Sequence, residues 1–335
     1  MEDLPFVGLD VAKSNFKVHL LADVLDGNKK LRGTFQRTRQ GFAGLCAWIK
    51  QHGFEKAWIC MEHTGPYWKP IADYMFREGH QISVIRADKA HYHAKSGDSR
   101  NKTDDQDAFN LATFVREKKP RLWQPAAVED EELRELHRRR DQLVKEQTRE
   151  TNRLEYEPLT QTVFDSIHDH LKFLEQQISS INEAIKSHMN SHPRQKEIKA
   201  LYASIPGIGE ITANALTAEI SDCSAFPSYK AVHAFVGLDL TKQESGTSLR
   251  KPDKISRKGN KSLRQKLYMA AMTAVRTDAH FRQFNERLKA KGKKHKVRMV
   301  AVMCKLLKTA YAVVKSRSPF VADFPNRCVA QEDTA

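Results

Sequence analysis

The fold of the first third of the chain depends on residues 5–23, PFVGLDVAKSNFKVHLLAD. Two apolar runs in this stretch flank a polar turn near Lys13–Asn15, and the pattern predicts two paired strands. Two further apolar runs, 56–64 and 81–86, predict buried strands with helical patterns around them. Strands separated by helices of roughly 10–15 residues are typical of α/β domains. The sequence therefore predicts an α/β domain with a mixed sheet over residues 1–125.

Four carboxylates lie at the ends of these apolar runs or on one helical face. Asp10 follows FVGL, and Glu62 follows AWICM. Asp104 and Asp107 are spaced i, i+3, so on a helix they share a face, whereas Asp105 points elsewhere. A buried strand aspartate is costly unless it binds a metal ion or a hydrogen-bond donor. We therefore expect the four acids to bind Mg²⁺ or Mn²⁺ for phosphodiester chemistry. Taken alone, Asp104 also fits a charge favoured at a helix N-terminus.

The composition argues against several classes of protein. The chain has 335 residues, of which 40% are hydrophobic, enough for more than one core. No apolar run reaches about 18 residues, which predicts no membrane-spanning helix. The acidic start MEDLPFVGLD does not resemble a signal peptide. The five cysteines are scattered without a C-x-x-C pair. We expect them to be reduced, in a cytoplasmic protein, instead of forming disulfides or a zinc site.

The positive charge of the chain is concentrated in one segment. The net charge is +15. Residues 250–317 contain 21 Lys and Arg but 3 Asp and Glu, whereas the rest of the chain contains 35 and 38. A local surplus of this size is typical of a surface that binds the phosphate backbone of nucleic acid. The alternative is a solvated helical surface, although such surfaces usually mix both signs.

Residues 126–193 form a polar, highly charged segment without glycine. Apolar side chains recur there in alternating steps of four and three residues, a heptad seam: Ile167, Leu171, Leu174, Ile178, Ile181 and Ile185. A weaker seam precedes it, and Pro158 separates the two. We expect two long coiled-coil helices, either as a hairpin within one chain or as an intermolecular dimerisation arm. An amphipathic helix packed on its own domain is the alternative.

The pattern of residues 194–325 predicts an all-helical domain, and residues 326–335 a frayed tail. The segment 204–216, SIPGIGEITANAL, places a short turn between two helical patterns. This is typical of a helix-hairpin-helix element, in which Gly207 and Gly209 let the backbone approach a phosphate at the N-terminus of the following helix. A plain turn between two helices is the alternative.

A glycine-containing loop after residue 240 combines serines with cations. Ser245 and Ser248 lie close to basic side chains that we expect to bind nucleic acid: Arg250, Lys251, Lys254, Arg257, Lys258, Lys261 and Arg264. A serine is a poor nucleophile unless a base takes its proton, while nearby cations can stabilise a phosphorane-like transition state. From residue chemistry alone, a phosphate-binding loop is the commoner use of such a sequence.

Several short motifs, in order along nearly the whole chain, match one family pattern. GLDVAK, E-H-T-G-x-Y-W and K-T-D-x-x-D-A occur in the first third. I-P-G-I-G, F-x-G-L, E-S-G-T-S and G-N-x-x-L-R occur in the last part. In these motifs the chain resembles the DEDD-type transposases of bacterial insertion sequences, the insertion sequence 110 family. One departure is Asp-Leu-Thr in GLDLTKQESG, where many relatives have Ala-Pro.

This resemblance implies a fold, a chemistry and partners. The implied fold is a RuvC-like (RNase H-like) domain, a coiled-coil connector and a helical transposase domain. The implied chemistry combines a Mg²⁺-dependent DEDD site, formed by the four acids above, with a serine that becomes covalently attached to DNA. Ser245 takes that position, and Ser248 is the alternative. The implied partners are donor and target DNA duplexes, a structured guide (bridge) RNA and further copies of the chain, as a dimer or tetramer, in the bacterial cytoplasm at the nucleoid.

Two other functions remain open from the sequence. A metal-dependent, junction-resolving endonuclease would use the four acids and an activated water, with Ser245 only binding phosphate. A non-enzymatic nucleic-acid-binding protein would use the acids structurally. The complete set of four carboxylates favours an enzyme.

Overall fold

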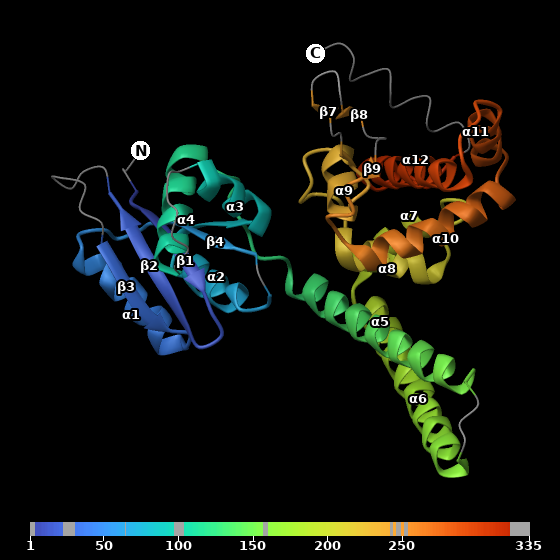
Figure 1. Ribbon diagram of the computed structural model, residues 1–335, viewed down its shortest axis with the longest axis horizontal. Helices are drawn as coiled ribbons and strands as arrows, with labels where there is room; N and C mark the ends of the chain where they lie inside the picture. Colours follow the sequence, from blue (N-terminus) through green and yellow to red (C-terminus); the bar gives the residue numbers. More distant parts are fainter. Residues whose placement is uncertain are drawn as a thin grey trace. The chain divides into compact units, whose positions relative to one another are not determined.

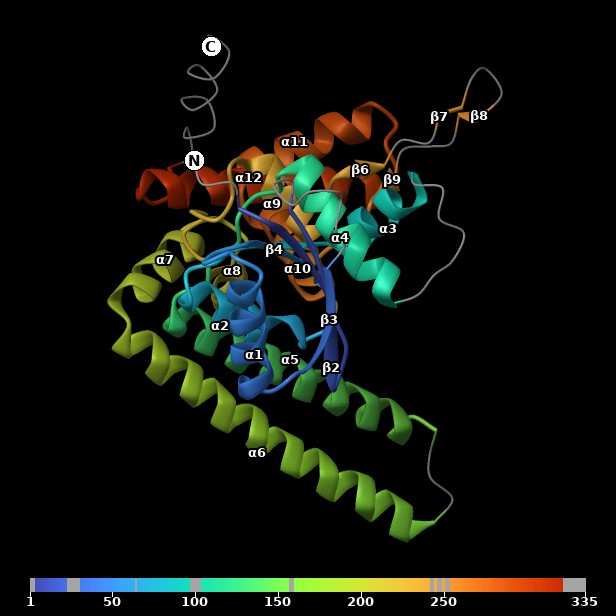
Figure 2. The ribbon, with the colours of Figure 1, turned by 90° about the vertical axis from the view of Figure 1, so that its left-hand side faces the viewer.

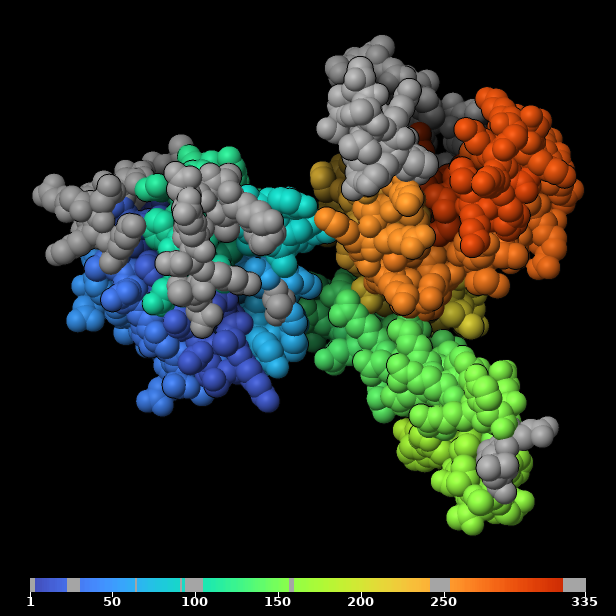
Figure 3. Space-filling model, in the orientation of Figure 1, coloured from blue at the N-terminus to red at the C-terminus, as the bar shows by residue number. Residues whose placement is uncertain are grey.

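The chain divides into two compact units, Met1–Ala126 and Ala127–Ala335 (Figure 1 and Figure 3). A computed structural model describes residues 4–22, 31–63, 65–96, 104–156, 160–241, 244–245, 249–250 and 254–321. The first unit contains a mixed sheet with helices, and the second is mostly helical. Among the helices of these ranges, none has the length and apolar character needed to cross a membrane.

The first unit is built on a five-stranded sheet in the order β3-β2-β1-β4-β5. Its strands are β1 (Phe6–Val11), β2 (Asn15–Leu21), β3 (Leu31–Gln36), β4 (Trp58–Glu62) and β5 (Gln81–Ile85). Strand β2 pairs antiparallel with β1 and β3, whereas β4 runs parallel to β1 and to β5. The strand pair and the mixed α/β sheet predicted from the sequence are confirmed.

Helices cover both faces of this sheet (Figure 1 and Figure 2). They are α1 (Arg39–Gln51), α2 (Trp68–Arg77), α3 (Ala87–Ser96) and α4 (Asp104–Lys118). Helices α1 and α2 pack on the face that presents Leu9, Val18 and Ile59. Helix α4 packs on the opposite face, where Leu111 lies in a smaller core with Cys60. The alternation of side chains along the strands thus supplies two apolar faces, one for each helical layer.

Helix α4 lies directly on β1 because position 8 has no side chain. A Cβ atom at Gly8 would lie 1.9 Å from the carbonyl oxygen of Ala108 and 2.4 Å from the amide nitrogen of Ala112. Any larger residue would force the helix backbone away from the sheet. Gly8 therefore sets the distance between α4 and the strand that contains Asp10.

The second unit is a helical bundle with four two-residue strands among its described residues. Its helices after the first two are α7 (Pro193–Ala203), α8 (Glu210–Ile220), α9 (Tyr229–Val236), α10 (Lys261–Thr277), α11 (Ala279–Ala290) and α12 (His295–Ser316). The strands form two antiparallel pairs, β6 (Leu240–Thr241) with β9 (Lys254–Ile255) and β7 (Glu244–Ser245) with β8 (Leu249–Arg250). The all-helical prediction for this part missed these pairs because strands of two residues leave no periodic pattern.

Two long helices, α5 (Val128–Leu154) and α6 (Gln161–Ser191), form a hairpin within one chain (Figure 1). The predicted heptad seam faces inward, since Leu174 and Ile185 are buried. At the base of the hairpin, Ile185 packs with Leu133 of α5 and Ala218 of α8. Of the arrangements that the heptad pattern allowed, the structure has the intramolecular hairpin, and its base belongs to the second unit.

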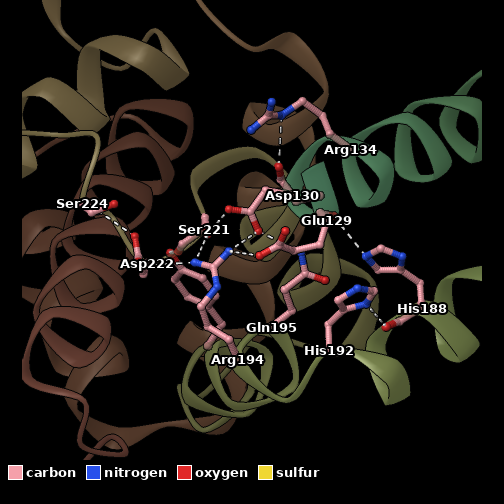
Figure 4. A network of polar contacts seen from close by, with 12 residues as sticks. Glu129, Asp130, Arg134, His188, His192, Arg194, Gln195, Ser221, Asp222 and Ser224 are labelled. Carbon is pink, nitrogen blue, oxygen red and sulfur yellow. Dashed lines mark hydrogen bonds and ion pairs between the residues drawn. The ribbon is translucent and has the colours of Figure 1, made fainter. Parts of the chain in front are cut away.

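A buried carboxylate fastens α5 to the bundle (Figure 4). Asp130, which is 7% exposed, accepts hydrogen bonds at one oxygen from Arg194 Nη2 at 2.6 Å and from Gln195 Nε2 at 2.8 Å. Its other oxygen accepts from Ser221 Oγ at 3.1 Å. The donors come from α7 and from the residue after α8, so one side chain joins three helices. A buried charge is tolerated when it is paired and hydrogen-bonded in this way.

A second carboxylate fastens α5 to α10. Lys266 Nζ donates to both oxygens of Asp141, at 2.8 and 2.6 Å, and Ser262 Oγ also donates to Asp141. Burial raises the pKa of Asp141, but the hydrogen bonds from Lys266 and Ser262 outweigh it and hold the pKa below its usual range. The carboxylate is therefore ionised at neutral pH, and the ion pair between α5 and α10 persists there.

Gly8→Ala is expected to destabilise the first unit by about 3 kcal/mol, because α4 must move off β1 to admit the methyl group. Urea unfolding followed by tryptophan fluorescence measures this, since all four tryptophans lie within residues 1–126. Gly44→Ala in α1 is the matched control. Its Cβ would lie 3.6 Å from Phe35, an ordinary contact, and alanine favours a helix over glycine. Equal unfolding midpoints for Gly8→Ala and wild type would contradict the role of position 8.

Candidate active site and nucleic-acid interface

Asp10 and Glu62 lie next to each other on adjacent parallel strands. The pairing of Leu9 with Met61 continues to the next position of each strand, which is Asp10 in β1 and Glu62 in β4. Residues at such neighbouring positions project from the same face of the sheet. Both side chains are partly exposed. Two of the predicted site acids are therefore neighbours near the carboxyl ends of their strands.

The face that presents Asp10 is the face that α4 covers. At the start of β1, Phe6 packs against a cluster that includes Leu111, Phe114 and Val115 from the C-terminal half of α4. Two residues further along β1, Gly8 touches Ala108 of the same helix. Helix α4 thus runs antiparallel to β1. The next residue on this face, Asp10, lies toward the N-terminal end of the helix.

The other two predicted acids belong to the first turn of α4. Asp107 is partly exposed, and the helix begins at Asp104, whose side chain lies outside the described residues. Between them, Asp105 forms an ion pair with Lys17, with 3.2 Å between Nζ and Oδ1. Lys17 is the β2 residue paired with Asp10. This ion pair therefore ties the first turn of α4 to the strand position next to Asp10.

The chemistry of this donor set suits a hard divalent cation. Carboxylates from β1, β4 and α4 supply the oxygen ligands that Mg²⁺ binds in proteins. Within the described side chains, no three His, Cys, Asp or Glu groups converge closely enough to hold a metal ion. Among the described side chains, Asp10 and Glu62 therefore lie side by side near the first turn of α4, without a closed metal site.

Ser245 lies in the short strand β7. Its backbone pairs with Leu249 of β8. The side chains of Ser245 and Arg250, together with all of Ser248 and Lys251, lie outside the described residues. The nucleophile and these two cations therefore stay predictions from the sequence.

The two glycines of the turn before α8 have different surroundings. Gly207 has a φ of +88°, and a Cβ atom there would meet the carbonyl oxygen of Ala270 at 2.5 Å and the amide nitrogen of Ala274 at 2.7 Å. Its close approach is to α10 of the same unit, which leaves no space for a phosphate on that side. Gly209 precedes α8, and its Cβ position has no atom within 4 Å. Only Gly209 offers the open approach expected of a helix-hairpin-helix turn.

The motif G-N-x-x-L-R fastens the start of α10 to the end of α9. A Cβ atom at Gly259 would lie 2.4 Å from the carbonyl oxygen of Phe235. Asn260 donates its backbone N–H to the same oxygen at 2.9 Å, and its side chain caps α10 by accepting from the Leu263 N–H at 3.0 Å. Leu263 is buried in the core. The sequence does not predict this packing role, because glycine, asparagine and leucine also occur in loops.

The basic residues predicted to bind nucleic acid separate into two groups. Arg264 Nη1 donates to the carbonyl oxygen of Val236 at 2.7 Å, at the C-terminal end of α9. Burial, followed by the nearby Arg257, lowers the pKa of Arg264. The other cations of this set whose side chains are described are exposed: Lys254, Arg257, Lys258 and Lys261. Arg264 therefore has a capping role in the fold, which nothing in the sequence distinguishes from the exposed cations.

Two family models and several curated relatives match the chain. A DEDD transposase model for IS110, described as "Transposase", covers residues 7–163, and a second, "Transposase IS116/IS110/IS902 family", covers residues 199–286. A pilin gene-inverting protein of Moraxella bovis is 33% identical over 322 residues, which span 94% of this chain and 97% of the relative. The chain belongs to the IS110 family of DEDD transposases. It is a DNA transposase or recombinase.

Other relatives agree with this assignment. A pilin gene-inverting protein of Moraxella lacunata matches with the same identity and coverage. The transposase for insertion sequence element IS1328 of Yersinia enterocolitica is 25% identical over 301 residues, or 81% of this chain and 84% of the relative. The first family model spans Asp10, Glu62, Asp104 and Asp107, and the second spans Ser245. The family resemblance predicted from the motifs is confirmed.

Arg264→Gln is expected to destabilise the second unit by about 1–3 kcal/mol, because the carbonyl of Val236 loses a charged donor. Thermal unfolding followed by far-ultraviolet circular dichroism measures the loss. Lys261→Gln is the control, since it removes the same charge at an exposed position and should change stability by less than about 0.5 kcal/mol. Equal midpoints for the two variants would show that the capping contact does not stabilise the fold.

Proposed function

We propose that this transposase cuts and rejoins donor and target DNA, with Mg²⁺ bound by the four DEDD acids and with Ser245 as the nucleophile. The main support is the strand register that makes Asp10 and Glu62 neighbours, beside the acidic first turn of α4. Acids from β1, β4 and α4 at one edge are the ligands that metal-dependent phosphodiester chemistry requires. The role of Ser245 is supported by its place in E-S-G-T-S and by the cations that follow it in the sequence.

An RNase H-like (RuvC-like) fold for the first unit is part of the proposal. The sheet order β3-β2-β1-β4-β5, in which β2 alone runs antiparallel to the other four strands, supports it. The position of the acids supports it as well, because they occupy the two central parallel strands and the helix packed across them. The same proposal treats residues 126–193 as a coiled-coil connector and residues 194–325 as the transposase domain.

The chemical step is a phosphoryl transfer to serine. The Oγ of Ser245 attacks phosphorus, the bond from phosphorus to one sugar oxygen breaks, and the protein is joined to the DNA. The hydroxyl proton passes to a base, and the leaving sugar oxygen gains a proton. Attack by a sugar hydroxyl of the other duplex reverses these steps and frees the serine. Bound Mg²⁺ supplies positive charge to the phosphate oxygens.

We propose strand exchange, in which cut DNA strands are rejoined, instead of hydrolysis alone. Two relatives with 33% identity are named pilin gene-inverting proteins, and inversion requires that cut strands be rejoined. A covalent protein–DNA link keeps the energy of the broken phosphodiester bond, so rejoining needs no added cofactor. A metal-dependent, junction-resolving endonuclease with activated water is the alternative, and it would leave Ser245 as a phosphate-binding residue.

We extend the proposal to two kinds of partner. A structured guide RNA is supported by the family resemblance and by the surplus of 21 basic over 3 acidic residues in 250–317. A dimer or tetramer of the chain is supported by the chemistry, because exchange between two duplexes requires several cuts. Exposed cations of this segment include Lys254, Arg257, Lys258 and Lys261. Action on chromosomal DNA corresponds to a location in the bacterial cytoplasm, at the nucleoid.

Asp10→Asn and Glu62→Gln are each expected to lower recombination between donor and target plasmids in cells by about 100-fold or more. A neutral amide binds a divalent cation far more weakly than a carboxylate. Glu117→Gln is the matched control, because Glu117 is exposed at the other end of α4. Full recombination by either test variant would overturn the metal-site proposal.

Ser245→Ala is expected to abolish both recombination and the covalent protein–DNA adduct, because no other atom in the proposal attacks phosphorus. The adduct is detected as labelled DNA that migrates with the protein on a denaturing gel. Ser248→Ala is the control and should keep both activities. If Ser245→Ala still cut DNA without forming an adduct, the endonuclease alternative would replace the serine mechanism.

A further inference from the structure

One face of α12 presents four cations in a row. Arg298, Lys305, Lys308 and Lys315 follow one another at steps of seven, three and seven residues. At about 100° per residue, these positions fall within an arc of about 100° on the helix. Between Arg298 and Lys315, the other positions on this arc are Ala301 and Ala312, so no bulky side chain stands between the cations. We call Arg298, Lys305, Lys308 and Lys315 the α12 stripe.

No carboxylate of the described residues pairs with the α12 stripe. Other cations of the same unit are paired, such as Lys266 with Asp141 and Arg138 with Glu219. None of the four stripe residues forms an ion pair with a described acid, and the Nε of Arg298 is buried without a hydrogen-bond partner there. A row of unneutralised cations is unfavourable in the free protein and becomes favourable beside an anion. The stripe therefore lacks the mixed signs of an ordinary solvated surface.

Aromatic rings hold the lysines of the α12 stripe in place. Lys305 Nζ lies 4.6 Å from the ring centroid of Phe284 in α11, and Lys308 Nζ lies 4.9 Å from that of Tyr229 in α9. Helices α9 and α11 both contact α12 (Figure 2). Lys315 Nζ lies 5.9 Å from the ring of Tyr311, one turn earlier on α12. A ring beneath an ammonium reduces its freedom while leaving its N–H donors available. The lysines are thus partly ordered before any ligand binds.

The positive charge of Lys305, at the centre of the stripe, is destabilised by its surroundings. Arg287 lies over the same Phe284 ring as Lys305, with 5.8 Å from its guanidinium carbon to the ring centroid. Burial, followed by the nearby Arg287, lowers the pKa of Lys305, and Asp278 opposes this only in part. Asp278 is already engaged, since its side chain caps α11 at the N–H of Phe281. An external anion would relieve the repulsion between Lys305 and Arg287.

The length of the stripe matches a polymer better than a small anion. Arg298 and Lys315 are 17 positions apart, so the stripe extends about 26 Å along the helix axis. That distance corresponds to about seven or eight base pairs of duplex DNA at about 3.4 Å each. Lysine ammonium groups act as point charges and bind phosphates without the planar fork that reads a guanine edge.

We propose that the α12 stripe is a track for the phosphate backbone of duplex DNA, which it binds without reading sequence. This inference rests on the proposed function, because strand exchange requires the chain to hold a duplex while its phosphodiester bonds are broken. Duplex DNA is chosen over RNA because the family acts on DNA. The stripe lies outside the loop and turn to which the sequence motifs point, on a helix that is otherwise part of the bundle core.

The test is the salt dependence of binding to a DNA duplex of arbitrary sequence, measured with the full chain by fluorescence anisotropy. The triple variant Lys305→Gln, Lys308→Gln, Lys315→Gln is expected to reduce the slope of log K against log salt by about 2.7, since each phosphate contact contributes about 0.9. The matched control removes three exposed lysines from α5, α6 and α7: Lys145→Gln, Lys186→Gln and Lys196→Gln. Its slope should equal that of wild type.

Two further variants keep the test decisive if the triple variant folds poorly. The single change Lys308→Gln, at an exposed position, should reduce the slope by about 0.9. Replacement of the three lysines by arginine keeps the charge and should keep the slope. A slope unchanged from wild type in Lys308→Gln and the triple variant would overturn the proposal. A reduced slope for an RNA duplex but not for DNA would overturn the choice of DNA.

The inference and the proposed function can fail separately. Recombination by Asp10→Asn tests the metal-site proposal, whereas the salt slope of the lysine variants tests the α12 stripe. If Asp10→Asn abolished recombination while the triple variant kept the wild-type slope, the stripe proposal alone would fall. If Asp10→Asn recombined normally while the triple variant lost slope, the stripe would stand and the metal-site proposal would fall.

Discussion

The contact between the backbone of α4 and β1 is the constraint on which the first unit depends. It exists because Gly8 has no side chain, which lets Ala108 and Ala112 come closer to the strand than any Cβ atom allows. The same contact decides where the first turn of α4 lies relative to Asp10, the next residue on that face. A residue without a side chain therefore sets how far the first turn of α4, which contains Asp107, lies from Asp10.

The sequence predicts local features of this fold well and long-range ones poorly. The apolar alternation of residues 5–23 is enough for the strand pair β1–β2, because both strands and their turn lie within one short segment. The pairing of β1 with β4 joins residues about 50 positions apart, and no local sequence pattern predicts it. The positions of Asp10 and Glu62 at the ends of apolar runs nevertheless predicted them as site residues. An acid beside a buried strand is costly unless it binds a metal ion or a hydrogen-bond donor. Their register, which makes them neighbours, required the sheet.

In the basic segment, residues 250–317, the sequence likewise predicts the overall property but not the role of each residue. Its composition predicts a polyanion-binding surface, but composition does not separate a cation that holds the fold together from one that faces solvent. Arg264 caps α9, and Lys266 neutralises the partly buried Asp141, whereas Lys258 and Lys261 are exposed. The α12 stripe was also hidden in the sequence, because the rings beneath its lysines come from α9 and α11 as well as from α12 itself.

The two carboxylates that fasten α5 have a mechanical meaning. Asp130 and Asp141 are 11 positions apart, which is about three helical turns, and they attach to different helices of the bundle. A rod held at two separated points can neither pivot nor spin about its own axis. The hairpin of α5 and α6 therefore acts as a lever with a fixed root. A force on its distal end would therefore be transmitted through Asp130 to α7 and through Asp141 to α10.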